Sequence, residues 1–346
     1  MSYKIYHLSH TDLDGYGCQM ITNHFFKNIE FLNSNYGKEI NERINQIINS
    51  IANNDIQNNL ILITDLNLTV EQARELEGKV KTNQKDVKLI LLDHHKSGQD
   101  SANEYDWYYL DHTRSATKIT YDFFSSIMGE DKKLSKLTDV INAVDIWLDD
   151  DKEFELGKVC LGFISGAREI NRIMFPKENS QYMFNILKNI QPYFNEKNPH
   201  IVLDEALHHI KKEYFKINND DTLSNLVSTC NVNMLTKNKN HMSIKYGEFK
   251  GILTYNIGNV SIIGNDFLKA NPDFDFFMDI TSRKTISLRA DGKLDVSKMA
   301  ARIGNGGGHP NASGGLLNSF KDSFVYDNIK KQVADILLSK GTHNEQ

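Results

Sequence analysis

Three short apolar runs, each followed by acidic or imidazole residues, constrain the fold of this chain more than any other feature. The first, residues 3–9, alternates in polarity, whereas 60–63 and 87–92 are almost continuously apolar. Patterns typical of helices separate them, over residues 40–51 and 70–80. Short strands that alternate with helices are typical of βαβ units. The sequence therefore predicts an α/β fold with a parallel sheet in its N-terminal half.

The residues that follow the three runs are of the types that bind metal ions. In an extended chain, residues two apart share one face, so the members of the first group can converge. The carboxyl ends of parallel strands meet at one edge of the sheet, where open α/β sheets build their sites. The residues are His10, Asp12 and Asp14 after the first run, Asp65 after the second, and Asp93, His94 and His95 after the third.

Asp145 adds a carboxylate from an otherwise apolar helical stretch. A buried carboxylate without a partner is costly, so Asp145 should face a cation or a hydrogen-bond donor. Four carboxylates and two imidazoles suit two divalent metal ions, with Mn²⁺ as the best match and Mg²⁺ as the second. Two such ions need a bridging acid, and a hydroxide that bridges them can attack phosphorus.

Two residues of the third group suit roles beside the metal ions. Asp93 can hold a ligand imidazole in the required tautomer. His95 can bind the scissile phosphate or protonate the leaving group. A single Asp after a strand is more commonly a helix cap. The prediction therefore depends on three successive strand ends of the same chemical character.

The C-terminal part predicts short strands and a phosphate-binding loop. Helices predicted at 296–303 and 327–339 flank a glycine-rich segment, residues 304–314. Glycines let backbone N–H groups approach a phosphate closely, and arginines add bidentate charge. A plain tight turn is the alternative interpretation. The predicted strands cover residues 242–246, 251–257, 276–281 and 285–289, and the predicted substrate-binding residues are Arg283, Arg289, Gly306, Gly307, Gly308 and His309.

Length and composition suit a globular protein of about two domains of roughly 150 residues each. We predict a metal-binding domain over 1–150, a helical linker over 151–235, and a smaller α/β domain with a mixed sheet over 236–340. The net charge of −5 and the lack of a Lys/Arg-rich block argue against extended duplex binding. No run of about 18 apolar residues and no secretory signal pattern occurs, so we expect a cytoplasmic protein without a membrane partner.

The motifs together resemble those of the DHH phosphoesterase superfamily. The resemblance implies two Mn²⁺ or Mg²⁺ ions, with Asp65 as their bridge. In several members a histidine precedes the first aspartate by four residues, where this chain has Leu8, so the role of His10 as a ligand stays open. The glycine-rich segment is similar to the GGGH signature of the DHH-associated C-terminal domain. The residues that match the metal-binding positions are Asp12, Asp14, Asp65, His94 and Asp145, and Ser282, Arg283 and 287–289 resemble substrate-facing strands.

Within this superfamily, the chain length and the glycine-rich domain resemble the nanoRNase group. The resemblance implies an exonuclease-type phosphodiesterase that hydrolyses short single-stranded RNA or dinucleotides to mononucleotides. The same residues would serve a 3′,5′-bisphosphate nucleotide phosphatase, or a cyclic or linear dinucleotide phosphodiesterase. Manganese pyrophosphatases share a similar metal-binding half, and a non-catalytic nucleotide sensor is the alternative from another class. Nothing in the sequence marks a subunit interface, and a homodimer stays open.

Overall fold

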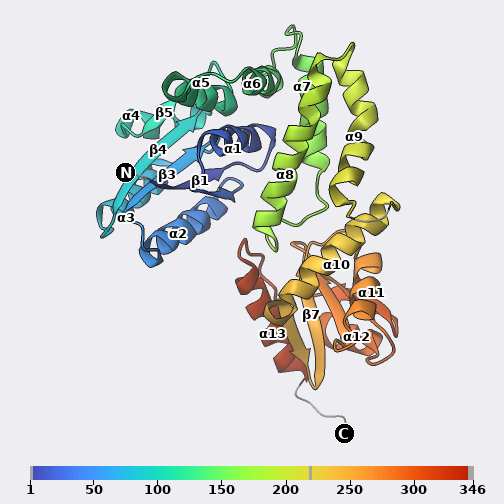
Figure 1. Ribbon diagram of the computed structural model, residues 1–346. Helices are drawn as coiled ribbons and strands as arrows, with labels where there is room; N and C mark the ends of the chain where they lie inside the picture. Colours follow the sequence, from blue (N-terminus) through green and yellow to red (C-terminus); the bar gives the residue numbers. More distant parts are fainter. Residues whose placement is uncertain (1–2, 218–219, 342–346) are drawn as a thin grey trace. The chain divides into compact units, whose positions relative to one another are not determined.

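The computed structural model describes residues 3–217 and 220–341, which form two compact units (Figure 1). The first unit comprises Met1–Ala167 and Pro176–Ile210, and the second comprises Arg168–Phe175 and Lys211–Gln346. The helices of the segment predicted as a linker, 151–235, are distributed over both units. No helix of the described residues is long and apolar enough to cross a membrane.

A parallel five-stranded sheet forms the centre of the N-terminal unit, in the order β2-β1-β3-β4-β5, which confirms the predicted fold class. Two of its strands were not predicted. β2 contains the polar residues Glu30 and Asn33, and β5 has only three residues, so neither shows a clear apolar run. The strands are β1 (Lys4–Ser9), β2 (Ile29–Asn33), β3 (Asn58–Thr64), β4 (Asp86–Asp93) and β5 (Tyr108–Leu110).

Helices cover both faces of this sheet (Figure 1). On one face, α2 and α3 pack their apolar sides against β1, β3 and β4. On the other face, Ile119 and Phe124 of α5 pack against Ile5 and Leu62. The helices of the unit are α1 (Leu13–Phe25), α2 (Lys38–Asn53), α3 (Val70–Lys81), α4 (Gln99–Glu104), α5 (Ala116–Met128), α6 (Lys132–Asp145), α7 (Phe154–Gly166), α8 (Pro176–Ile190) and the first part of α9 (Pro199–Phe215), with 3₁₀ turns at Lys96–Gly98 and Gln191–Asn195.

Gly15 and Gly17 predict a turn ahead of a helix that begins at about Cys18, but helix α1 begins five residues earlier, at Leu13. Asp12 caps it, because its side chain accepts a hydrogen bond from the Gly15 backbone N–H at 3.0 Å. A Cβ atom at Gly15 would collide with the backbone of His10. The glycine we assigned to a turn therefore lies inside the helix, where it allows the helix to start directly beside the end of β1.

The C-terminal unit contains a six-stranded sheet in the order β10-β11-β9-β8-β7-β6. Only β7 and β8 are parallel, so the predicted mixed sheet is confirmed. The helix α11, between β7 and β8, was not predicted. The elements are α10 (Leu223–Met242), β6 (Ser243–Tyr246), β7 (Phe249–Tyr255), α11 (Val260–Ala270), β8 (Phe276–Ile280), β9 (Thr285–Ala290), α12 (Val296–Gly304), β10 (Gly307–His309), β11 (Ala312–Leu316) and α13 (Tyr326–Gly341).

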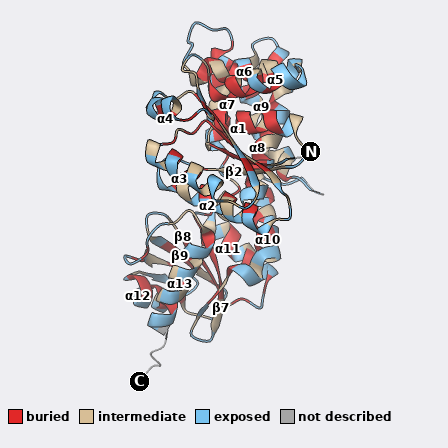
Figure 2. Ribbon diagram, turned by 90° about the vertical axis from the view of Figure 1, so that its left-hand side faces the viewer, coloured by how far each residue is buried: buried red, intermediate tan, exposed pale blue. Residues whose placement is uncertain are grey.

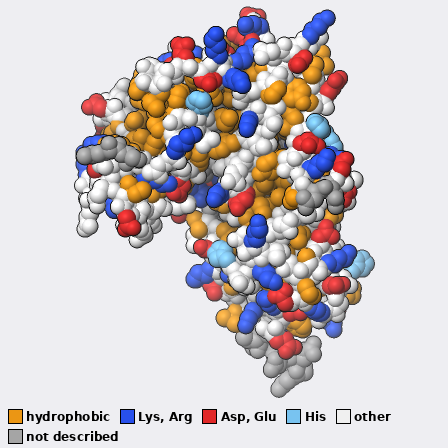
Figure 3. All heavy atoms as spheres, viewed as in Figure 1, with side chains coloured by type: hydrophobic (Ala, Val, Ile, Leu, Met, Phe, Trp, Pro, Cys, Tyr) orange, Lys and Arg blue, Asp and Glu red, His pale blue; other side chains and the backbone are white. Residues whose placement is uncertain are grey.

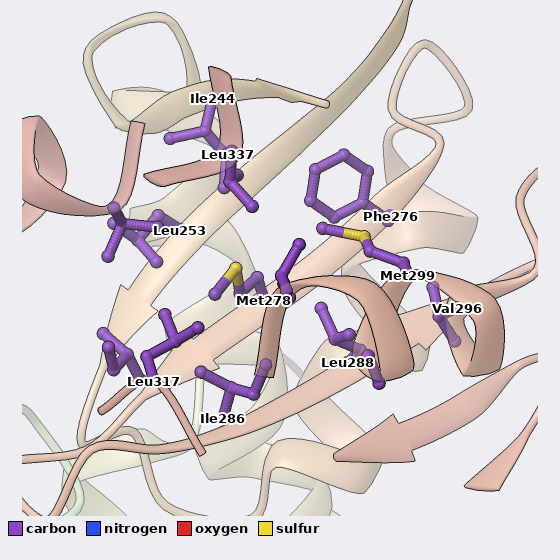
Figure 4. Packing of buried hydrophobic residues seen from close by; sticks show 14 of the residues in the cluster. Ile244, Leu253, Phe276, Met278, Ile286, Leu288, Val296, Met299, Leu317 and Leu337 are labelled. Carbon is purple, nitrogen blue, oxygen red and sulfur yellow. The ribbon is translucent and has the colours of Figure 1, made fainter. Parts of the chain in front are cut away.

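One face of this sheet carries the core of the unit (Figure 4). Met278 and Leu288 contribute from adjacent strands, while Met299 contributes from α12 and Leu337 from α13. Figure 2 shows that buried residues are concentrated in the strands, whereas the helices also carry exposed residues. The opposite face of the sheet carries α11, which contacts β8 and β9.

The glycine-rich segment forms a β-hairpin rather than the loop that we predicted. Strands β10 and β11 pair in antiparallel register, with His309 opposite Ala312. A Cβ atom at Gly306 would collide with the Gly314 carbonyl oxygen, and Gly308 has φ 147°, which residues with side chains rarely adopt. The glycines therefore allow close backbone packing in a paired strand. A glycine-rich composition alone does not distinguish such a strand from a flexible loop.

Candidate active site

The carboxyl end of β1 places one imidazole and two carboxylates at the edge of the parallel sheet. Asp12 lies at the N-terminus of α1, and its Oδ2 accepts a hydrogen bond from His10 Nδ1 at 2.7 Å. Burial raises the pKa of Asp12, but this hydrogen bond and the His10 charge outweigh burial and lower it to about 2. Asp12 is therefore ionised at neutral pH.

Asp14 is fully buried and is held by the N-terminus of α5. Its two oxygens accept hydrogen bonds from the backbone N–H groups of Ala116 and Thr117, both at 2.8 Å. Unsatisfied N–H groups and the helix dipole favour a negative charge at this end of a helix. The fold thus fixes the position of Asp14.

Asp65 follows β3 with φ 54°, a left-handed conformation that Asp tolerates better than most residues. Its side chain is buried, and among the described residues its Oδ2 atom has no hydrogen-bond partner. Burial raises the pKa of Asp65 well above its usual value, and the charges of Asp12 and Asp14 raise it further. A carboxylate in this position favours the approach of a cation.

His94 joins the carboxylates, because its Nε2 atom lies close to three of them. The distances are 3.4 Å to Asp65 Oδ1, 3.4 Å to Asp145 Oδ2 and 3.7 Å to Asp14 Oδ2. Burial lowers the pKa of His94, which favours the neutral imidazole that metal ions bind. Asp145 is the last residue of α6, and burial together with Asp14 and Asp12 raises its pKa to about 9.

Three overlapping sets of side chains can each hold a metal ion, with one ligand atom per residue and all atoms of a set within 4.8 Å of one another. Asp65 belongs to two of these sets. The Oδ2 atoms of Asp65 and Asp145 are buried without hydrogen-bond partners among residues 3–217 and 220–341, as expected for oxygens that face a cation. The donor set therefore fits divalent metal ions. The sets are His10, Asp12 and Asp65; Asp65, His94 and His95; and Asp14, His94 and Asp145.

Asp93 and His95 form a hydrogen-bonded chain next to these sets. Asp93 Oδ1 accepts a hydrogen bond from His95 Nδ1 at 2.7 Å, and its Oδ2 accepts one from the Tyr108 hydroxyl at 2.7 Å. Asp93 thus holds His95, which belongs to one of the metal-ligand sets, so the expected role of Asp93 in holding a ligand imidazole stays a prediction. Burial lowers the pKa of His95, but the hydrogen bond and charge of Asp93 outweigh burial and raise it.

Tyr36 was missed by the sequence analysis, although it contacts this site directly. Its hydroxyl lies 2.9 Å from His95 Nε2 and 3.4 Å from the Asp65 carbonyl oxygen, and its ring lies 4.7 Å from that of His10. Tyr36 follows β2, which lies beside β1 in the sheet. Recognition of β2 as a strand would have placed Tyr36 at the same sheet edge.

In the C-terminal unit, Arg289 and His309 lie at matching positions across the sheet. Arg289 of β9 pairs with Ala312 of β11, which in turn pairs with His309 of β10, so their side chains share one face. Arg289 donates a hydrogen bond from Nη2 to Ser261 Oγ at 2.6 Å. His309 is exposed, and Arg283 is exposed in the turn between β8 and β9. Figure 3 shows Lys and Arg side chains interspersed with Asp and Glu side chains on the face that it displays.

A parallel α/β sheet with acidic and imidazole residues at its carboxyl edge is the arrangement expected of a metal-dependent phosphoesterase, and the comparisons with known proteins support this class. The sequence profile described as "DHH family, N-terminal domain" matches residues 4–144. A 3′,5′-cyclic-nucleotide phosphodiesterase of Helicobacter pylori (strain ATCC 700392 / 26695) is 41% identical over 342 residues, 96% of this chain and 98% of that protein. The chain belongs to the DHH family, and the predicted superfamily is confirmed.

Two further comparisons extend over most of the chain. Oligoribonuclease NrnB of Bacillus subtilis (strain 168) is 26% identical over 324 residues, 90% of this chain and 72% of that protein. The crystal structure of an uncharacterized protein from Helicobacter pylori G27 superposes with a TM-score of 0.93 at 40% identity, covering 98% of this chain and 100% of that one. Both units of this chain therefore have counterparts in one solved structure.

Proposed function

We propose that the protein hydrolyses phosphodiester bonds in small nucleotides, with 3′,5′-cyclic mononucleotides as the first candidate substrates. The observation that carries the proposal is the convergence of acidic and imidazole ligands on Asp65. The 41% identity to a cyclic-nucleotide phosphodiesterase supports this choice of substrate, because the alignment includes both units.

The residues that would hold two divalent ions come from the three ligand sets, two of which contain Asp65. Mn²⁺ is the first candidate and Mg²⁺ the second, since both prefer carboxylate oxygens and accept imidazole. Bound ions would lower the pKa of water and stabilise negative charge on the phosphoryl oxygens. The ligands in this proposal are Asp12, Asp14, Asp65, His94 and Asp145, with His10 as a further ligand of the set that contains Asp12.

His95 is proposed to contact the scissile phosphate or to protonate the leaving oxygen. Its Nδ1 is held by Asp93, so the ring orientation is fixed and Nε2 is the atom that can face a substrate. The Tyr36 hydroxyl oxygen lies 2.9 Å from His95 Nε2. A phosphate oxygen would take the place of this hydroxyl or share the nitrogen with it.

The C-terminal hairpin is proposed to supply substrate-binding groups. Arg289 supplies a fixed positive charge and His309 an exposed imidazole on the same sheet face. The backbone of Gly307 and Gly308 has no side chains that would block a phosphate, whereas the Gly306 N–H already donates to the Ala300 carbonyl oxygen at 3.1 Å. Arg283 adds a second guanidinium from the neighbouring turn.

Very short RNA is the second candidate substrate, because oligoribonuclease NrnB aligns with 90% of this chain. Hydrolysis to mononucleotides, exonuclease action, the cytoplasmic location and a homodimer stay predictions. A 3′,5′-bisphosphate nucleotide phosphatase would use the same ligands, and a nucleotide sensor would bind nucleotides without turnover.

A product profile tests the proposal. The full chain is incubated with Mn²⁺, Mg²⁺ or EDTA and with cyclic AMP, RNA of two to about ten nucleotides, a 3′,5′-bisphosphate nucleotide or pyrophosphate. We expect metal-dependent conversion of cyclic AMP to AMP, no turnover in EDTA, and loss of turnover in Asp65→Ala. Faster turnover of dinucleotides would select the second candidate. Phosphate release from pyrophosphate alone, or no turnover of any substrate, would refute a phosphodiesterase.

A further inference from the structure

Helix α6 ends in a backbone arrangement that ordinarily requires glycine. The Leu148 N–H donates to the Ala143 carbonyl oxygen at 2.8 Å, and the Trp147 N–H donates to the Val144 carbonyl oxygen at 3.4 Å. These two bonds form a Schellman motif, in which the residue at the Trp147 position adopts the left-handed conformation. Trp147 has φ 56°, although this conformation is unfavourable for a bulky side chain.

Burial does not account for this tryptophan. The residue is 62% exposed, and its ring meets that of Phe154 edge-on with the centroids 5.0 Å apart. Most of the indole surface is therefore in contact with solvent. Both the backbone and the solvation of this position would favour glycine, so folding alone gives no reason for a tryptophan here.

The position of Trp147 next to the metal-ligand sets suggests a reason. It follows Asp145 by two residues, and Asp145 Oδ2 lies 3.4 Å from His94 Nε2. Because consecutive Cα atoms are about 3.8 Å apart, the backbone of Trp147 lies within about 8 Å of that of Asp145. Exposed aromatic rings bind nucleobases by stacking, with little dependence on which base is present.

We propose that Trp147 is a binding residue for the nucleobase of the substrate, on which the base stacks while its phosphodiester lies at the Asp65 ligand sets. This inference rests on the proposed function, since it assumes a nucleotide substrate. The rigid end of α6 fixes Trp147 relative to Asp145. The same helix terminus thus supplies a ligand to the phosphodiester site and a contact for the base.

Fluorescence tests the contact without catalysis. The chain has two tryptophans, Trp107 and Trp147, so Trp107→Phe leaves Trp147 as the sole indole. This variant is titrated in Mg²⁺ with 5′-AMP and with ribose 5-phosphate, which has the same sugar and phosphate but no base. We expect saturable quenching by AMP and little change with ribose 5-phosphate. Equal responses to the two ligands, or no response to AMP, would overturn the proposal.

Kinetics separate a base contact from a structural role. Trp147→Gly should raise KM for the nucleotide substrate by roughly tenfold, the scale of one base–aromatic stack. The loss should be smaller on bis(4-nitrophenyl) phosphate, which has no nucleobase, and Trp147→Phe should recover most of the affinity. Because glycine suits the left-handed position, Tm should not fall. An equal rise in KM for both substrates would refute the base contact. If the wild-type protein hydrolyses no phosphodiester, the proposed function is refuted, and the AMP titration alone then decides this inference.

Discussion

Replacement of Asp65 by Asn should stabilise the protein without metal and destabilise it relative to wild type with metal. The Asp65 side chain is buried, its Oδ2 atom has no hydrogen-bond partner among the described residues, and burial and nearby carboxylates raise its pKa. In EDTA this carboxyl group lowers the free energy of unfolding, because it ionises more easily in the unfolded chain, where water solvates its charge. Asparagine keeps the shape of the side chain but carries no charge.

The size of the effect follows from the environment of Asp65. A buried polar group without a partner costs about 1–3 kcal/mol and a charged one costs more, so the exchange of the charged group for a neutral amide should recover a difference of similar size. In a unit of this size, about 1 kcal/mol corresponds to roughly 2–4 °C in Tm. We therefore expect Asp65→Asn to raise Tm in EDTA by roughly 2–10 °C. A ligand at 100 times its Kd stabilises by about 2.7 kcal/mol, so metal ions should raise the wild-type Tm by a similar amount.

Differential scanning fluorimetry at pH 8, in EDTA and in saturating Mn²⁺, measures both effects. The expected result is a crossover, with Asp65→Asn above wild type in EDTA and below it in Mn²⁺. Asp279→Asn is a matched control, because Asp279 is also buried but belongs to the other unit and to none of the metal-ligand sets. It should raise the Tm of its own unit equally in both conditions. A Tm of Asp65→Asn below that of wild type in EDTA, or an equal response of both proteins to Mn²⁺, would refute the reasoning.

Three further substitutions test separate parts of the structure. Burial raises the pKa of Asp279 to about 7, so the destabilising effect of its charge develops as the pH rises from about 4 to about 7. Asp279→Asn should therefore increase the free energy of unfolding, measured with urea, by up to about 4 kcal/mol at pH 8 and by almost nothing at pH 4. Equal increases at the two pH values would contradict this. His309→Ala should raise KM by roughly tenfold in steady-state assays with kcat nearly unchanged, since a hydrogen bond to a charged group is worth about 1.5–3 kcal/mol. A decrease confined to kcat would instead place His309 in the chemical step. Tyr36→Phe removes the hydroxyl at 2.9 Å from His95 Nε2 and should lower kcat by roughly 3- to 10-fold, whereas an unchanged kcat would exclude a positioning role for that hydroxyl.

The sequence predicted the parallel sheet because its central strands are buried on both faces. β3 and β4 appear as nearly continuous apolar runs, and each run ends directly before a polar group. β2 and β5 lie at the edges of the sheet, where shorter and more polar strands are tolerated, and they were missed. Because β2 was not predicted, Tyr36 was missed as well. Only the position of β2 beside β1 brings Tyr36 to the same edge of the sheet.

The acidic and imidazole residues that meet at the sheet edge could be named from the sequence, but their hydrogen-bond partners could not. The hydrogen bonds from α5 to Asp14 join residues about 100 positions apart, and no local pattern reveals them. Which imidazole Asp93 contacts depends on the direction of its side chain, and the sequence does not specify that direction. The glycine-rich segment was identified correctly as a feature, but its pairing into β10 and β11 depends on backbone contacts with Gly314.

Several unfavourable local features of the N-terminal unit gather where the sequence motifs and α6 end. Asp65 and Trp147 both have φ near 55°, at 54° and 56°, and neither is glycine. Among the described residues, Asp65 Oδ2 and Asp145 Oδ2 have no hydrogen-bond partner; the first lies 3.8 Å from His10 Nδ1 and the second 3.4 Å from His94 Nε2. Such features persist only where the surrounding structure holds them, and here the rigid ends of β3, β4 and α6 do so. Bound cations at the ligand sets would satisfy these oxygens but would not change the conformation of Trp147. Metal binding would therefore offset the first cost and leave the second to a different ligand.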